Sequence, residues 1–279
     1  MFSVAKAAAA CMVSMQLGTN PATTPVPRLD ADWWKARHEE RVAFTQSGSA
    51  TIVFLGDSIT QGWESTGLAT WNAQLAPLGA ANFGFSGDRT EHVLWRLQNG
   101  EIVKLQPKVI VLLIGTNNVG HGISTPSQSA EGVHAILAYI KTSMPRTRVA
   151  LMGLLPRDLL PTDEMRRKAD AITGEIQKFA DGHRVVYVDV GQFFLHRDGS
   201  LRETSLPDRL HLNAGGYEIW AQAIVPTLKE GTPKEGTLKV AKPLLSGAVP
   251  IVVPPSRNET VPAGVPPPGG ELATFAERS

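Results

Sequence analysis

The feature that most constrains the fold is an alternation of apolar, β-branched runs with amphipathic segments along residues 30–229. The run 109–114 is apolar on both faces, as a strand in the middle of a parallel sheet must be. We expect strands near residues 51–55, 80–83, 108–114, 147–153 and 184–188. Helical spacing of apolar residues falls before, between and after them, near 30–46, 66–76, 89–99, 127–143, 163–180 and 214–229. This order predicts an α/β fold in which helices cover both faces of a central parallel sheet of about five strands.

The chain divides into three parts by composition. Residues 1–28 begin with a short basic region that ends at Lys6, and an alanine-rich apolar run follows over residues 7–17. This pattern favours a secretory signal, with a disordered start as the alternative. A cleaved signal would make the protein secreted or periplasmic, and the alternative location is the cytoplasm. The run is too short and too rich in alanine to span a bilayer, so we expect no transmembrane segment. Residues 29–230 form the predicted domain, and residues 231–279 form a proline-rich C-terminal tail.

The balance of charged residues and cysteines excludes several classes of protein. Lys and Arg number 27 against 26 Asp and Glu, so the net charge of +1 makes no case for binding nucleic acid or an anionic membrane. Cys11 is the only cysteine, which rules out an internal disulfide and a cysteine-rich metal site. No phosphate-binding glycine loop and no His-Glu-x-x-His motif is present, so we expect neither a cofactor nor a metal.

Three polar turns follow predicted strands, at residues 56–58 (Gly-Asp-Ser), 82–88 and 115–118. The carboxyl ends of parallel strands meet at one edge of a sheet, where ligands bind in folds of this kind. We therefore expect these turns to form one site.

Ser58 is the candidate nucleophile of that site. A serine hydroxyl needs a base within hydrogen-bond reach, and Asp208 and His211 provide an acid and a base three positions apart. We expect His211 to be the general base and Asp208 to fix its tautomer. The alternative is that Ser58 only caps the helix that follows it.

Gly87 and Asn117 are the candidate oxyanion donors, together with the N–H of Ser58. Gly87 lacks a Cβ that would obstruct its N–H, and Asn117 offers a side-chain amide. The alternatives are a plain turn glycine and an asparagine that ties down its own loop. We expect Asp57 and Asp88 to brace loops by accepting backbone N–H groups.

Further roles are expected close to these residues. Asn213 would cap the following helix, and His121 is a candidate to line the pocket. Substrate contacts are expected from residues next to Ser58, Asn117 and His211, namely Ile59, Thr116 and Leu210.

At these blocks the chain resembles the GDSL, or SGNH, hydrolase superfamily, whose blocks centre on a Ser, a Gly, an Asn and a His. The resemblance covers roughly residues 30–229. It is greatest to the catalytic-subunit group of intracellular platelet-activating-factor acetylhydrolases and their bacterial relatives, through residues 92–97, 115–118 and 153–157. The resemblance implies a flavodoxin-like three-layer α/β/α sandwich, no metal, and hydrolysis of small acyl esters. It also assigns Ser58, Asp208 and His211 to a triad, and Ser58, Gly87 and Asn117 to an oxyanion hole.

The sequence thus predicts a serine esterase that removes short acyl groups, acetyl foremost, from a carbohydrate or a lipid. Its partner would be a small acyl-ester substrate, and a homodimer is kept open as its assembly. The alternative is a non-catalytic module on the same fold that binds a carbohydrate or a partner protein. A nucleotide- or flavin-binding protein is disfavoured because the phosphate loop is missing.

Overall fold

The computed structural model describes residues 19–229, which contain a five-stranded parallel sheet in the order β2-β1-β3-β4-β5. The strands are β1 (Ile52–Gly56), β2 (Ala80–Gly84), β3 (Val109–Leu113), β4 (Arg148–Met152) and β5 (Val185–Val188). Every residue of β1 and β3 is buried, because helices cover both faces of these interior strands. The predicted strands are confirmed, as is the three-layer α/β/α sandwich.

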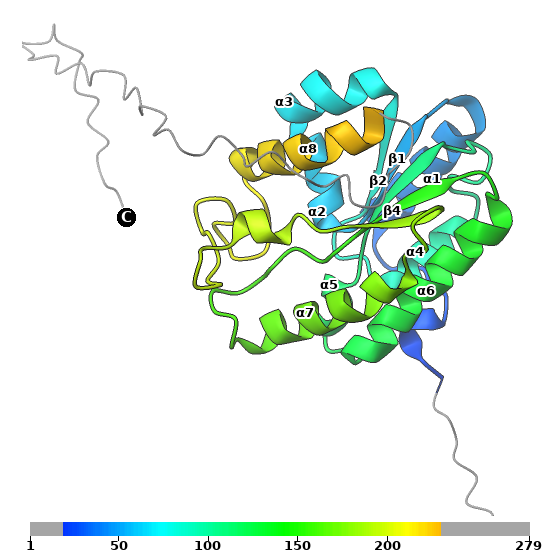
Figure 1. Cartoon of the computed structure of the whole chain (residues 1–279). Helices are drawn as coiled ribbons and strands as arrows, with labels where there is room; N and C mark the ends of the chain where they lie inside the picture. The colour runs from blue at the N-terminus through cyan, green and yellow to red at the C-terminus, as the bar shows by residue number, and fades with distance from the viewer. Residues whose placement is uncertain (1–18, 230–279) are drawn as a thin grey trace, which may run out of the picture. The chain divides into compact units, whose positions relative to one another are not determined.

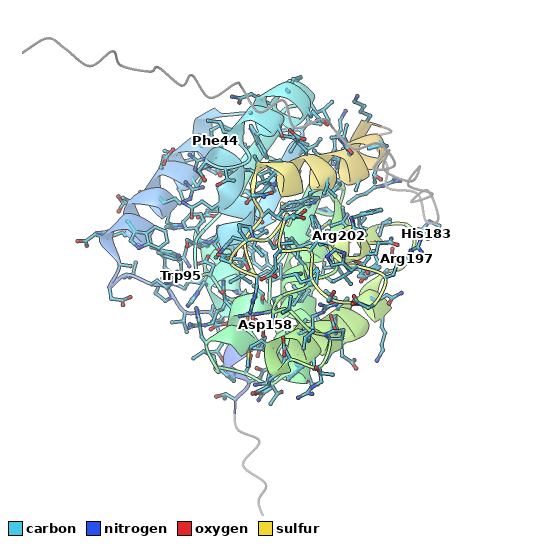
Figure 2. All side chains as sticks on the ribbon, turned by 90° about the vertical axis from the view of Figure 1, so that its left-hand side faces the viewer. Phe44, Trp95, Asp158, His183, Arg197 and Arg202 are labelled. Carbon is cyan, nitrogen blue, oxygen red and sulfur yellow. The ribbon has the colours of Figure 1, made fainter. Side chains whose placement is uncertain are left out.

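The helices form two layers (Figure 1). They are α1 (Asp32–Ser47), α2 (Ser58–Gln61), α3 (Leu68–Thr70), α4 (Thr90–Gln98), α5 (Thr116–Gly120), α6 (Pro126–Ser143), α7 (Glu164–Ile176) and α8 (Ala214–Lys229). Helices α4, α6 and α7 pack side by side on one face of the sheet, while α3 and α8 cover the other. The C-terminal end of α1 is fixed by Phe44, labelled in Figure 2, whose ring meets that of Phe83 in β2 at a centroid distance of 6.1 Å.

The helix predicted over 66–76 is wrong as a single element. The segment is broken into α3, a π-helical turn at Trp71–Leu75 and a 3₁₀ turn at Ala76–Leu78. Pro77 lies in the last of these turns, and Gly79 ends it in the left-handed conformation with φ +72°. The helix predicted over 163–180 ends at Ile176 and continues as a 3₁₀ turn.

An aromatic cluster fixes α8 against the sheet. The ring of Trp63 lies 4.5 Å from Tyr217 and 5.1 Å from Trp220, both of α8, measured between centroids. Phe54 of β1 packs edge-on against Trp71 at 5.2 Å. Large aromatic side chains bury the most apolar area per residue, so this cluster determines where α8 lies relative to the first strand.

The sequence predicted that the domain starts at residue 29, but residues before that position already pack against it. A 3₁₀ turn at Pro21–Thr23 buries Ala22 completely, and the carbonyl of Ala22 accepts a hydrogen bond from the hydroxyl of Thr90 in α4. The side chain of Asn20 donates to the carbonyl of Gln128 in α6. The rest of the predicted N-terminal segment (1–18) and the whole of the predicted tail (231–279) lie outside the described residues. Within residues 19–229, no helix has the length and apolar character needed to cross a membrane.

Candidate active site

Ser58 is presented at the carboxyl end of β1, as the first residue of the short helix α2. A Cβ on Gly56 would lie 2.3 Å from the carbonyl oxygen of Leu113, so only glycine allows β1 and β3 to approach this closely. Asp57, not Ser58, caps α2, because its carboxylate accepts the N–H of Ile59 at 3.0 Å. The hydroxyl of Ser58 is therefore not used as the cap.

Ser58, His211 and Asp208 form one hydrogen-bonded chain. The Oγ of Ser58 lies 2.9 Å from Nε2 of His211, and Nδ1 of His211 lies 2.7 Å from Oδ2 of Asp208. Since a carboxylate only accepts hydrogen bonds, Nδ1 carries the proton in this pair. Nε2 is then the acceptor that faces the serine hydroxyl, which is the arrangement a general base requires.

The turn that carries Asp208 and His211 is fixed from within. Oδ1 of Asp208 accepts the backbone N–H of His211 at 2.7 Å and that of Leu210 at 3.0 Å. Arg209 between them adopts φ +62°, which folds the turn tightly enough for one carboxylate to reach both the backbone and the ring. Asn213 then caps α8 by accepting the N–H of Gly216 at 2.9 Å, as the sequence predicts.

The local environment keeps Asp208 ionised. Burial acts to raise its pKa, but the hydrogen bonds from the backbone and ring of His211 and from Leu210 outweigh it and hold the pKa below its ordinary value. The side chains of Asp208 and His211 are 54% and 43% exposed, so the base side of the site is open to solvent.

The residues predicted as oxyanion donors lie in the two neighbouring turns. Gly87 has φ +73°, a conformation that favours glycine. The amide nitrogen of Asn117 donates one hydrogen bond to the carbonyl of Asp88 at 2.9 Å, which leaves its second N–H available. Among the described residues, the N–H groups of Ser58 and Gly87 donate to no protein acceptor.

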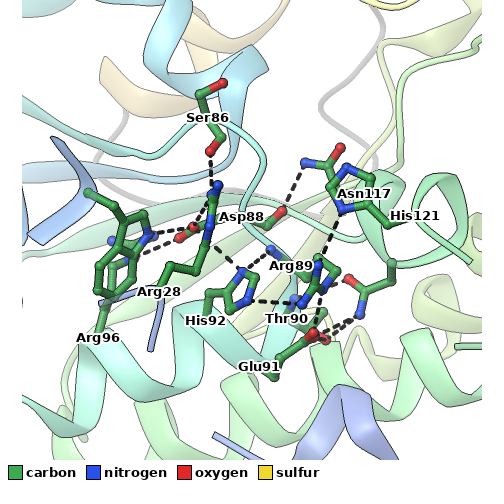
Figure 3. Close-up of polar contacts among 12 residues, drawn as sticks. Arg28, Ser86, Asp88, Arg89, Thr90, Glu91, His92, Arg96, Asn117 and His121 are labelled. Atoms are coloured by element: carbon green, nitrogen blue, oxygen red, sulfur yellow. Dashed lines mark hydrogen bonds and ion pairs between the residues drawn. The ribbon is translucent and has the colours of Figure 1, made fainter. Parts of the chain in front are cut away.

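Asp88 anchors this region through side chains (Figure 3). Its carboxylate accepts Nε1 of Trp34 at 2.7 Å and Nε of Arg96 at 2.9 Å, and Nη1 of Arg28 lies 3.4 Å away. The expectation that Asp88 accepts backbone N–H groups is thus wrong, because three side-chain donors occupy its oxygens, two of them from the segment before β1. Burial raises the pKa of Asp88 to about 6, against the opposing effects of Arg96, Trp34 and Arg28.

A second group of basic side chains lies near Asn117. Nη1 of Arg89 lies 3.3 Å from Nδ1 of His121 (Figure 3). Nη1 of Arg157 donates to the hydroxyl of Thr116, the residue before Asn117, at 3.1 Å. Burial, followed by the charges of the nearby arginines, lowers the pKa of His121, which favours its neutral form. The sequence singled out His121, and Arg157 belongs to a block that carries the family resemblance, but nothing in the sequence placed Arg89 or Arg157 beside this histidine.

The three predicted substrate contacts have different surroundings. Ile59 belongs to the hydrophobic core and is 2% exposed, so its side chain offers almost no surface to a ligand. Thr116 is 4% exposed and is held by Arg157. Leu210 is half-buried beside His211. Contact of these residues with a substrate stays a prediction.

A flavodoxin-like sheet that presents a histidine-bonded serine at the end of an interior strand defines the class of SGNH acylhydrolases. The comparison with protein families agrees: the chain belongs to the GDSL-like lipase/acylhydrolase family, whose model matches residues 54–219. It is a hydrolase that acts on ester bonds.

Known proteins extend this result over most of the chain. The platelet-activating factor acetylhydrolase IB subunit alpha1 of Bos taurus is 37% identical over 209 residues, which cover 74% of this chain and 88% of that protein. The subunit of the same name from Homo sapiens matches to the same extent. A crystal structure of a GDSL-like lipase from Bacteroides thetaiotaomicron shares the fold with a TM-score of 0.60 and 20% identity, covering 70% of this chain and 98% of that one.

Proposed function

We propose that this protein is a serine esterase that removes short acyl groups, acetyl foremost, from a hydroxyl group of a carbohydrate or a lipid. The observation that carries the proposal is the unbroken hydrogen-bonded chain from Ser58 through His211 to Asp208, with distances of 2.9 and 2.7 Å. The name of the sequence relatives, an acetylhydrolase at 37% identity, supports acetyl as the acyl group.

In the first half of the reaction, Ser58 attacks the ester carbonyl while Nε2 of His211 takes the hydroxyl proton. The negative charge that develops on the carbonyl oxygen is stabilised by the N–H groups of Ser58 and Gly87 and the amide of Asn117. His211 then gives its proton to the departing alkoxide, so the alcohol leaves and the acyl group stays on Ser58.

In the second half, water takes the place of the serine hydroxyl. His211 removes a proton from the water, which attacks the acyl-serine carbonyl, and the same proton returns to Oγ of Ser58 as the acid departs. Asp208 stays ionised throughout and holds the ring in the tautomer with Nδ1 protonated. Its lowered pKa is consistent with this role.

The test is turnover of p-nitrophenyl acetate by the wild type and by Ser58→Ala. The variant should lose at least about 10³-fold in kcat, because no nucleophile is left for the covalent step. Ser65→Ala is the matched control, since Ser65 is an exposed serine just beyond α2 whose hydroxyl contacts only the carbonyl of Gly62. Equal rates for Ser58→Ala and the wild type would refute the proposal.

The alcohol is identified by a second measurement on the same enzyme. The enzyme is given acetylated sugars in one set of reactions and acetylated lipids in another, and the released acetate is measured in both. The preferred class is the one with the higher kcat/KM, since that ratio measures discrimination between substrates.

A further inference from the structure

We propose that Arg28 is a positioning residue that orients the N–H of Gly87 towards the reacting carbonyl. This inference rests on the proposed function, because it assigns a task to a residue beside the proposed oxyanion hole. Nη1 of Arg28 donates to the carbonyl oxygen of Ser86 at 2.7 Å and lies 3.4 Å from Oδ1 of Asp88. One guanidinium nitrogen therefore contacts the residues on both sides of Gly87.

The contact with Ser86 controls the direction of the Gly87 N–H. The carbonyl of Ser86 and the N–H of Gly87 belong to the same peptide unit, which is planar and trans, so they point in opposite directions. When Arg28 holds the carbonyl, the N–H is directed away from Arg28. A cation on the carbonyl oxygen also polarises the peptide and makes its N–H a better donor.

Gly87 needs such a restraint more than another residue would. Its φ of +73° lies in a region that glycine enters and leaves at little cost, so the peptide before it can rotate. A Cβ on Gly87 would lie 3.2 Å from Nη1 of Arg28, which shows that the guanidinium lies directly against this residue. Arg28 thus restrains the loop at the glycine whose backbone is free to adopt other conformations.

Arg28 is itself held in place by its own segment. Its guanidinium lies 5.3 Å from the ring centre of Trp33 in the first turn of α1, at cation–π distance. Its carbonyl accepts the N–H of Ala31 at 3.1 Å. Arg28 precedes the region that matches the family model, so a segment outside that region reaches the oxyanion loop.

Arg96 holds Asp88 from the protein interior, whereas Arg28 approaches from the surface with 26% of its side chain exposed. The two arginines therefore have separable tasks. Removing Arg28 leaves the Trp34 and Arg96 bonds to Asp88 in place, so the loop keeps its anchor but Ser86 loses its donor.

The experiment compares an oxoester with its thionoester in Arg28→Ala, Arg28→Lys and the wild type. Sulfur accepts weaker hydrogen bonds than oxygen, so the ratio of the two kcat values reports how well the oxyanion is bound. Arg28→Ala should lower kcat for the oxoester about 10- to 100-fold, less than the loss of a whole donor, with KM within about threefold. The oxo-to-thiono ratio should fall by the same factor as kcat. Arg28→Lys should be intermediate, and added guanidinium ion should restore part of the activity of Arg28→Ala.

Arg184→Ala is the matched control. Arg184 also ties a segment down through carbonyl groups, donating to Met144 at 2.8 Å and Thr147 at 3.2 Å, but it precedes β5 at the opposite end of the sheet. This variant should melt at a lower temperature with the kinetic ratio unchanged. If Arg28→Ala also melts at a lower temperature but keeps the oxo-to-thiono ratio of the wild type, the positioning role is refuted. The proposed function stands in that case, provided that Ser58→Ala is inactive. If Ser58→Ala is as active as the wild type, both are refuted.

Discussion

Nε2 of His211 lies 2.9 Å from Oγ of Ser58, although the two residues are 153 positions apart in the chain. Ser58 opens α2, and His211 lies just before α8. The same two segments are joined a second time, because the hydroxyl of Tyr217 in α8 donates to the carbonyl of Ile59 at 2.7 Å. The packing of α8 beside α2 therefore sets the distance on which the proposed chemistry depends.

Replacing Asp208 by asparagine should lower kcat for p-nitrophenyl acetate by roughly 10⁴-fold, because an amide no longer favours the tautomer with Nδ1 protonated. The melting temperature should change little, since more than half of the Asp208 side chain is exposed. Steady-state kinetics and a thermal melt on the same sample check both statements. A loss smaller than tenfold would mean that His211 is oriented by something other than Asp208.

Replacing Asn117 by alanine should lower kcat about 10²- to 10³-fold with a smaller effect on KM, as expected for a donor that acts mainly in the transition state. Asn99→Ala is the control, because Asn99 also donates its amide to a backbone carbonyl, that of Trp95 at 2.8 Å, but at the end of α4. If the two variants have the same kcat, Asn117 only ties its loop to Asp88.

The fold could be predicted because its signals are local. Residues 109–113 are apolar at every position, and the structure buries all five in the middle of the sheet. The single helix predicted over 66–76 does not form, and the reason lies in tertiary packing. The π-helical turn buries Trp71 and Leu75 against the core, and Pro77 prevents a regular helix from continuing.

The sequence could predict those site residues that occur together in short sequence blocks. Asp208 and His211 are three positions apart, and one turn joins them. The contact of Asp88 with Arg28 spans 60 positions, so no motif or period in the sequence indicates it. Such contacts depend on how the segment before the first strand packs, which only the assembled structure shows.

Replacing Asp57 by asparagine should stabilise the protein increasingly as pH rises. Burial raises the pKa of Asp57 to about 7 from 3.8, and Oδ2 has no hydrogen-bond partner among the described residues. Between pH 4 and pH 7 the folded state therefore binds more protons than the unfolded state. The stability that Asp57 contributes is full below about pH 4 and is lost as the pH rises to about 7.

Asparagine keeps an oxygen for the N–H of Ile59 but carries no charge. The difference in unfolding free energy, variant minus wild type, should rise between pH 4 and pH 7, by at most about 4 kcal/mol, and level off above. Denaturant unfolding at several pH values measures it, and taking the difference cancels the other titrating groups. A difference that is flat with pH would show that Asp57 is ionised without penalty.

Replacing Tyr217 by phenylalanine should lower both stability and turnover. Loss of its buried hydrogen bond to the carbonyl of Ile59 should cost about 1–2 kcal/mol of unfolding free energy. It should also lower kcat several-fold, because the bond helps to hold α8 beside α2 and hence His211 beside Ser58. Tyr139→Phe is the matched control, since the Tyr139 hydroxyl donates to the carbonyl of Leu97 at 3.0 Å, on the opposite face of the sheet. That variant should lose comparable stability with kcat unchanged. Equal kcat values for the two variants would show that the aromatic packing alone sets the distance between serine and imidazole.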